Sequence, residues 1–183
     1  MGNLVLLTGL PGSGKTTVIE RTVQMLADLT PGGFITRELR RPDGARLGFE
    51  IRTFSGDSAI LAHVRIESPF RVGKYGVDLQ ALERTGVAAI YRAIQDADFV
   101  VVDEIGKMEL LSPAFREAVH AAIRSPKPVL ATIMLRSHPF ADALKQTPGA
   151  EVRLVTPQSR DALPAWTAAC IRRALSQRPN RTP

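Results

Sequence analysis

The sequence predicts an α/β fold, a three-layer sandwich in which helices cover both faces of a mainly parallel sheet. Strongly apolar segments at 99–102 and 128–134 alternate with helical segments, as in a parallel sheet that is buried on both faces. Between residues 34 and 62, by contrast, short segments of alternating polarity follow one another with turns and no helix between them. We therefore expect an antiparallel β-meander that extends one edge of the sheet.

The N-terminal segment combines a strand, a glycine-rich loop and a helix. An apolar strand at 3–8 leads into G-x-x-x-x-G-K-T at 9–16, and an amphipathic helix follows from Thr17 to near Asp28. Glycines at these positions let successive backbone N–H groups surround a polyphosphate at a helix N-terminus, where the helix dipole also favours anions. The sequence therefore predicts binding of a nucleoside triphosphate. The expected contacts are Gly9, Leu10, Pro11, Gly12, Ser13, Gly14, Lys15, Thr16 and Thr17.

Two side chains of this loop have predicted chemical roles. Lys15 is expected to reach the β- and γ-phosphates, and the hydroxyl of Thr16 is expected to bind Mg²⁺.

Turn signals in the sequence locate the strands of the meander. Pro31-Gly32-Gly33 is expected to break the first helix, and Pro42-Asp43-Gly44 and Ser55-Gly56-Asp57 are turn signals. The strands expected around these turns are 34–39, 46–54 and 59–62, and residues 65–76 are expected to be irregular.

The second half of the chain supplies the remaining layers. Asp78 is expected to cap a helix with an apolar face from Leu79 to Ile94. Ser112 and Pro113 are typical of an N-cap and first helical position, with a helix that runs to about Arg124. The other expected elements are the strands 99–104, 128–134 and 151–155, a short helix at 139–145 and a closing helix at 161–175.

Asp103 and Glu104 follow directly after the buried strand at 99–102. The carboxyl end of a parallel strand faces the ligand side of the sheet, so Asp103 is placed to hold Mg²⁺ directly or through water. Glu104 is placed to orient or deprotonate a water that attacks the γ-phosphate. This pair favours hydrolysis of the triphosphate over phosphate transfer.

The chain resembles a family of small P-loop nucleoside-triphosphatases with a RecA-like core. The blocks that carry the resemblance are 9–17, 32–38, 47–49, 72–77, 103–110, 128–132, 155–156 and 160–164. The resemblance implies Mg²⁺-dependent hydrolysis of ATP, GTP and other nucleoside triphosphates to the diphosphate and phosphate, with loose base selectivity. It also implies that the strand bearing Thr132 lies between the phosphate-loop strand and the Asp103 strand, with Thr132 near the γ-phosphate or the attacking water. Ser159, where the family commonly has asparagine, and Ile133-Met134-Leu135, where basic residues are common, depart from its pattern.

Several basic residues are candidates for the positive charge that a phosphoryl-transfer transition state needs. Lys107 ranks first because it follows the Asp103-Glu104 pair by three residues, and Lys74, Arg71 and Arg136 are alternatives. Arg160, in the loop before the closing helix, is expected to stack on any nucleobase through a cation–π contact. The competing interpretation of that loop is that Asp161 simply caps the closing helix.

Length, net charge and cysteine content limit the classes of protein to which this chain can belong. The 183 residues are enough for one domain, which we expect at 1–175, with a disordered basic tail at 176–183. The formal net charge of +6 comes largely from arginines near the C-terminus (Arg172, Arg173, Arg178 and Arg181), so nucleic-acid binding is possible but not indicated. The single cysteine, Cys170, excludes an intramolecular disulfide. We expect a cytoplasmic protein that has no signal peptide and does not bind membranes. The sequence does not determine its oligomeric state, and a monomer is favoured.

Two other functions stay open at this point. One is a nucleoside or nucleotide kinase, for which residues 65–74 are the candidate lid. The other is a regulatory ATPase stimulated by nucleic acid.

Overall fold

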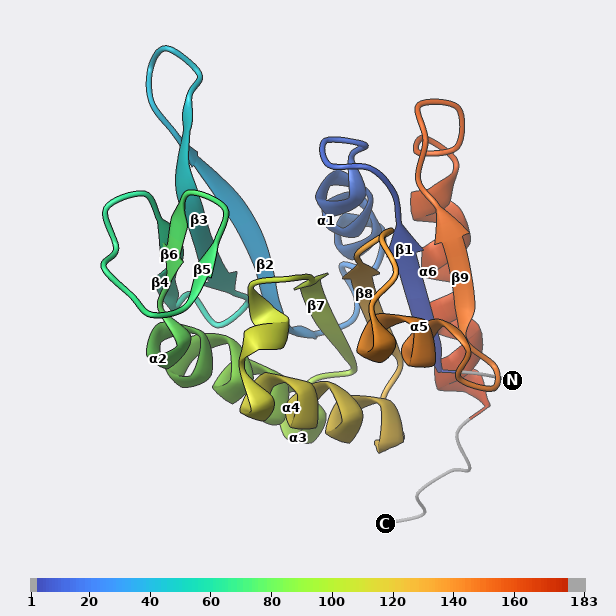
Figure 1. The fold of residues 1–183 in the computed structure, drawn as a ribbon. Helices are drawn as coiled ribbons and strands as arrows, with labels where there is room; N and C mark the ends of the chain where they lie inside the picture. The colour runs from blue at the N-terminus through green and yellow to red at the C-terminus, as the bar shows by residue number, and fades with distance from the viewer. Residues whose placement is uncertain (1–2, 178–183) are drawn as a thin grey trace.

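The computed structural model describes residues 3–177, and these contain one sheet of nine strands in the order β5-β6-β4-β3-β2-β7-β8-β1-β9 (Figure 1). The strands are β1 (Leu4–Thr8), β2 (Pro31–Arg40), β3 (Arg46–Thr53), β4 (Ser58–His63), β5 (Arg71–Val72), β6 (Tyr75–Val77), β7 (Phe99–Ile105), β8 (Val129–Ile133) and β9 (Glu151–Leu154).

The core of the sheet is parallel. Strand β1 pairs with β8 on one side and β9 on the other, and β7 pairs with both β8 and β2. The strand that bears Thr132, β8, therefore lies between the phosphate-loop strand and the Asp103 strand, as the resemblance implied. The carboxyl ends of β1, β7 and β8 consequently meet at one edge of the sheet.

The predicted antiparallel extension is present and begins at β2. This strand pairs in parallel with β7 through residues 31–34 and antiparallel with β3 through 34–40, and β4, β6 and β5 continue the extension. Two predictions about it were wrong. The strand begins at Pro31 rather than at Phe34, and residues 65–76, expected to be irregular, contain the short hairpin of β5 and β6.

Packing explains why Gly32 does not break the strand. A Cβ on Gly32 would stand 2.6 Å from the Cβ of Ala93 and 2.8 Å from that of Ala97. The glycine is therefore there to let β2 approach the helix that bears Ala93, and its local turn preference is overridden.

Helices cover both faces of the sheet (Figure 1). They are α1 (Lys15–Met25), α2 (Leu79–Ala81), a π-helical segment η1 (Leu82–Val87), α3 (Ala88–Asp96), a 3₁₀ turn η2 (Glu109–Leu111), α4 (Pro113–Arg124), α5 (Pro139–Lys145) and α6 (Leu163–Ser176). One apolar core joins the sheet to α3, α4 and α5, and the other joins it to α1 and α6. Neighbouring residues of β1 alternate between the two cores, Leu4 and Leu6 in one and Val5 and Leu7 in the other, which confirms the three-layer prediction.

The ends of the helices show which of the predicted N-caps form. The side chain of Asp78 accepts a hydrogen bond from Ala81 N and that of Ser112 accepts one from Phe115 N, so both predicted caps are confirmed. The competing interpretation that Asp161 caps the closing helix is wrong, because α6 begins at Leu163 with Ala162 at the N-cap. Ser176, expected to open the tail, is the last residue of α6, and the rest of that tail from residue 178 lies outside the described residues.

Among residues 3–177, no helix has the length and apolar character needed to span a lipid bilayer.

Candidate active site

The glycine-rich loop connects β1 to α1 at the carboxyl edge of the sheet. Gly14 forms the N-cap of α1 with φ 97°, in the left-handed region that glycine adopts at little cost. This conformation lets the helix start immediately at Lys15, and Val18 N donates to Gly14 O at 2.9 Å. The hydroxyl of Ser13 is buried and has no hydrogen-bond partner within the described residues. The nine predicted loop residues therefore lie together at one helix N-terminus.

Lys15 lies inside the turn of the loop. Its side chain is buried, and Nζ donates hydrogen bonds to the carbonyl oxygens of Gly9 at 3.2 Å and Leu10 at 3.3 Å. Burial raises the pKa of both Asp103 and Glu104, and the charge of the Lys15 ammonium group opposes that rise. A cation held by loop carbonyls at a helix N-terminus is suited to a polyphosphate.

The side chain of Asp103 lies at the centre of a hydrogen-bond network, and the residue is 2% exposed. Its Oδ2 accepts a hydrogen bond from Thr16 Oγ1 at 2.7 Å, and its Oδ1 accepts one from Thr132 Oγ1 at 2.6 Å. The backbone N–H of Thr36 donates to Oδ2 at 3.4 Å. Burial raises the pKa of Asp103, while these hydrogen bonds and Lys15 act in the opposite direction.

The donor set suits a small, hard cation. Thr16 and Asp103 offer oxygen ligands that touch one another, as Mg²⁺ prefers. Within residues 3–177 no group of three or more His, Cys, Asp or Glu side chains is arranged to hold a metal. A cation seated at Thr16 and Asp103 would therefore take its other ligands from water and phosphate, which is the usual arrangement for Mg²⁺.

Glu104 lies beside this centre and is partly buried. Burial raises the pKa of its carboxyl group, Lys15 lowers it and Asp103 raises it again. A carboxylate with a raised pKa is a stronger base toward water than an exposed glutamate.

Sequence reasoning assigned no role to one buried acidic residue beside the site, Glu109. It lies in η2, is 5% exposed, and its pKa is raised to about 8 by burial first and then by Glu104 and Asp103. The sequence signal that could have identified Glu109 is an acidic residue between the apolar residues Met108 and Leu110, in a segment otherwise typical of a buried one.

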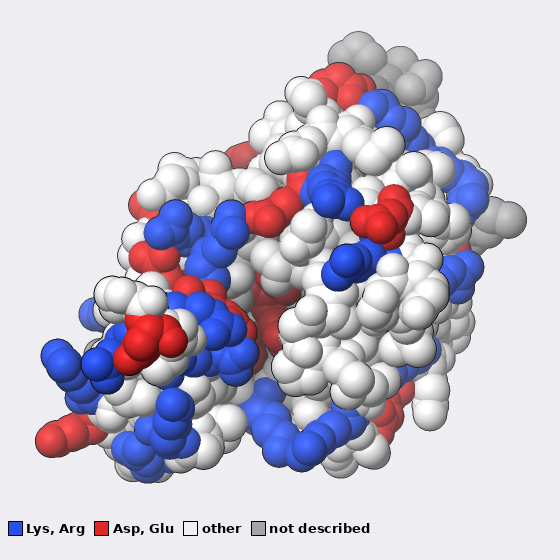
Figure 2. All heavy atoms as spheres, turned by 90° about the horizontal axis from the view of Figure 1, so that it is seen from above, with Lys and Arg blue, Asp and Glu red and all other residues white. Residues whose placement is uncertain are grey.

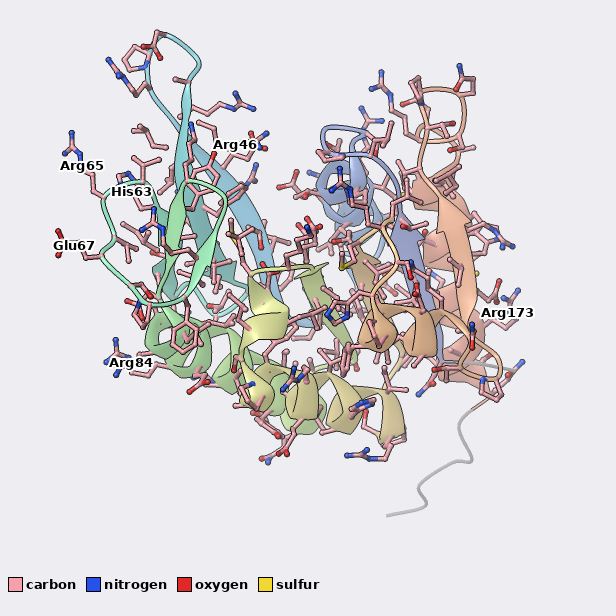
Figure 3. All side chains as sticks on the ribbon, viewed as in Figure 1. Arg46, His63, Arg65, Glu67, Arg84 and Arg173 are labelled. Atoms are coloured by element: carbon pink, nitrogen blue, oxygen red, sulfur yellow. The ribbon has the colours of Figure 1, made fainter. Side chains whose placement is uncertain are left out.

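The other predicted residues are not brought into contact with this centre. Lys107 is exposed, and no hydrogen bond or ion pair of its side chain is found within residues 3–177. Lys74 lies over the ring of Tyr75 at 5.4 Å, and Arg71 donates to Lys74 O at 3.0 Å. Arg136 is exposed. Arg65 projects outward beside the antiparallel extension, Arg84 projects from η1, and Arg173 projects from α6 on the opposite side (Figure 3).

Arg160 lies over the phosphate loop. Its Cδ is 3.7 Å from the point where a Cβ on Gly14 would stand. A pocket of about 250 Å³ opens here, lined by Gly14, Thr17, Val18, Arg21, Arg160 and Asp161. Arg21 and Asp161 form a 3.1 Å ion pair at its wall.

Viewed onto the carboxyl edge of the strands, the molecule has a hollow with acidic side chains on its floor and Lys and Arg side chains around its rim (Figure 2). Anions approaching this edge therefore meet positive charge before they reach the buried carboxylates.

Comparisons with known proteins agree with this geometry. A family model described as NTPase matches residues 4–166. The nucleoside-triphosphatase THEP1 of Thermotoga sp. strain RQ2 is 45% identical over 87% of this chain and 90% of its own length. The crystal structure of THEP1 from Aquifex aeolicus superposes with a TM-score of 0.83 at 34% identity, covering 91% of this chain and 98% of that one. The solution structure of a human cancer-related nucleoside triphosphatase gives a TM-score of 0.79 at 33% identity, covering 96% and 99%.

Proposed function

Because this chain belongs to the THEP1 family of nucleoside-triphosphatases, we propose that it hydrolyses ATP, GTP and other nucleoside 5′-triphosphates to the diphosphate and phosphate in a Mg²⁺-dependent reaction. The observation that carries the proposal is the hydrogen bond between Thr16 and Asp103, because it joins the phosphate loop to the acidic end of β7. Nucleotide and cation are thereby offered neighbouring ligands.

Each residue of the site has a part in this reaction. The loop N–H groups and Lys15 hold the β- and γ-phosphates, and Mg²⁺ at Thr16 and Asp103 would neutralise charge on the same phosphates. Glu104 accepts a proton from the attacking water, whose oxygen forms the new bond to the γ-phosphorus while the bond to the β,γ-bridging oxygen breaks. Lys107, which is exposed and follows Glu104 by three residues, would supply positive charge when nucleotide is bound.

Base selectivity is loose in this proposal. The pocket beside Gly14 lies against the phosphate loop, and its Arg160 side chain is exposed and can stack on the face of any base.

The test is phosphate release from ATP, GTP, CTP and UTP, with and without Mg²⁺. We expect turnover of all four, dependence on Mg²⁺, loss of turnover with retained binding in Glu104→Gln, and loss of binding in Lys15→Ala. Full turnover by Glu104→Gln would remove Glu104 from its role. Transfer of the phosphate to an added nucleoside or monophosphate, or turnover only with added RNA or DNA, would overturn simple hydrolysis.

A further inference from the structure

Glu109 and Glu104 converge on a single glycine. A Cβ built on Gly106 would stand 3.1 Å from Glu109 Oε2 and 3.2 Å from Glu104 Oε1. The two carboxyl groups therefore border the same small space, which is open only because residue 106 has no side chain. The turn of η2 folds Glu109 back onto the end of β7, where Leu110 N donates to Gly106 O at 3.0 Å.

No ion pair accounts for this approach of two acidic groups. Within residues 3–177, neither Glu104 nor Glu109 forms an ion pair with a lysine, arginine or histidine. The groups that do act on Glu109 are the backbone N–H groups of Glu109 and Gly106, which hydrogen-bond its carboxyl group, and the negative charges of Glu104 and Asp103. A buried carboxyl group with such neighbours needs a reason to be there.

We propose that Glu109 is a positioning residue that holds the carboxylate of Glu104 toward the γ-phosphate site, an inference that rests on the function proposed above for Glu104. Glu109 fixes the turn at Gly106 through the two backbone N–H groups, and its own carboxyl group limits where the Glu104 carboxyl can lie.

The charge state of Glu109 fits this task. Burial and the adjacent carboxylates raise its pKa to about 8, so at neutral pH it is mostly uncharged and carries an O–H. Two close carboxyl groups are stable together when they share one proton rather than when both are ionised. Glu109 in the acid form carries no negative charge and can border the same space as the Glu104 carboxyl group without repelling it.

The experiment compares Glu109→Ala, Glu109→Gln, Glu104→Gln and the double variant Glu104→Gln/Glu109→Ala. Steady-state phosphate release gives kcat and KM, and titration with a non-hydrolysable ATP analogue gives Kd. We expect Glu109→Ala to lower kcat by about tenfold or more while KM and Kd change by less than about threefold. Glu109→Gln, which keeps the size and, like the acid form, carries no charge, is expected to stay within about threefold of the parent kcat.

The double variant separates positioning from general structural damage. If Glu109 acts through Glu104, then Glu109→Ala changes the residual rate of Glu104→Gln by less than about twofold. A full additional loss in the Glu104→Gln background, parent-like kcat in Glu109→Ala, or weakened nucleotide binding in proportion to kcat would each overturn the proposal. The matched control is Glu83→Gln, a glutamate that accepts from Ser112 Oγ at 2.6 Å on the same side of the sheet, and its kcat should be unchanged.

A second variant guards against misfolding of Glu109→Ala. Gly106→Ala puts a methyl group into the space that the two carboxyl groups border, and we expect it to lower kcat by about tenfold with nucleotide binding retained. Parent-like kcat in Gly106→Ala would count against the proposal. If Glu104→Gln keeps full turnover, the proposed function fails; if it loses turnover while Glu109→Ala keeps it, only the present inference fails.

Discussion

Thr16 and Asp103 are separated by 87 positions in the chain, and a hydrogen bond of 2.7 Å joins their side chains. Thr16 lies in the first turn of α1 and Asp103 lies near the carboxyl end of β7, so the contact exists only because the carboxyl ends of β1 and β7 lie at the same edge of the sheet. The Thr16 hydroxyl and the Asp103 carboxylate both offer oxygen atoms, the type of ligand that Mg²⁺ prefers. The relationship therefore ties nucleotide binding to metal binding.

Removing the Thr16 hydroxyl should weaken the metal site more than the fold. We expect Thr16→Ala to raise the Mg²⁺ concentration for half-maximal phosphate release by about tenfold or more, since one ligand is lost and Asp103 loses a donor. Thr16→Ser retains the hydroxyl and should stay near the parent value. The same Mg²⁺ dependence in Thr16→Ala and the parent would show that Thr16 does not bind the metal.

Thr132 should matter for stability through Asp103. Its buried hydroxyl donates to Asp103 Oδ1 at 2.6 Å, and Thr132→Val has nearly the same shape without the donor. We expect the free energy of unfolding, measured by urea denaturation, to fall by about 1–3 kcal/mol because a buried carboxylate oxygen loses its partner. Thr132→Ser should recover most of this loss. An unchanged urea midpoint in Thr132→Val would contradict the argument.

Glu109 should make the protein less stable at alkaline pH. Its pKa is raised from 4.5 in the unfolded chain to about 8 in the folded protein, so the folded state binds the proton more tightly. The stability this contributes is fully present below pH 4.5 and is lost as the pH rises toward 8. In metal-free buffer the melting temperature should fall between pH 5 and pH 9, and Glu109→Gln should flatten that fall. An equally steep fall in Glu109→Gln would assign it to other groups.

Gly14 and Gly44 allow a test of what the loop conformation is for. Both have positive φ, 97° and 84°, so alanine at either position should cost about 1–2 kcal/mol of stability. Only Gly14 lies in the phosphate loop. We expect Gly14→Ala to lose nucleotide binding, measured by titration, and Gly44→Ala to keep it. Comparable binding in the two variants would show that strain at Gly14 does not shape the nucleotide site.

Arg160 should affect all nucleotides alike. If its guanidinium stacks on the base, Arg160→Ala should raise KM for ATP, GTP, CTP and UTP by similar factors of about two- to fivefold. The control is Arg153→Ala, whose guanidinium lies 4.3 Å from the ring centre of Trp166 and away from the pocket residues. A rise in KM for only one base would replace stacking with a specific hydrogen bond.

The sequence predicted the parts of the site that depend on neighbouring residues and on parallel strands. The glycine loop and the Asp103-Glu104 pair each have a local pattern, and parallel pairing then brings Thr16 and Asp103 to one edge. Glu109 had no such pattern. Its burial follows from the 3₁₀ turn that folds it back beside Gly106, a tertiary event that an amphipathic period does not show.

Tertiary structure also explains where the predictions of secondary structure were wrong. Gly32 is typical of a helix breaker in isolation, but it lies within β2, where the absence of a side chain lets the strand pass close to Ala93 and Ala97. At this place a contact between distant segments outweighs the local preference. Asp161 is of a residue type typical of caps, yet α6 begins at Leu163 with Ala162 at the N-cap, and the Asp161 carboxylate forms an exposed ion pair with Arg21.

The position of β1 has a consequence for how the protein is made. Both of its partners, β8 and β9, come from the last third of the chain. On a ribosome that adds about 5–20 residues per second, the phosphate loop would wait on the order of ten seconds after its own synthesis before its strand had a neighbour. The nucleotide site of a nascent chain can therefore be completed only after β8 and β9 have been made, and β1 gains its neighbours long after its own synthesis.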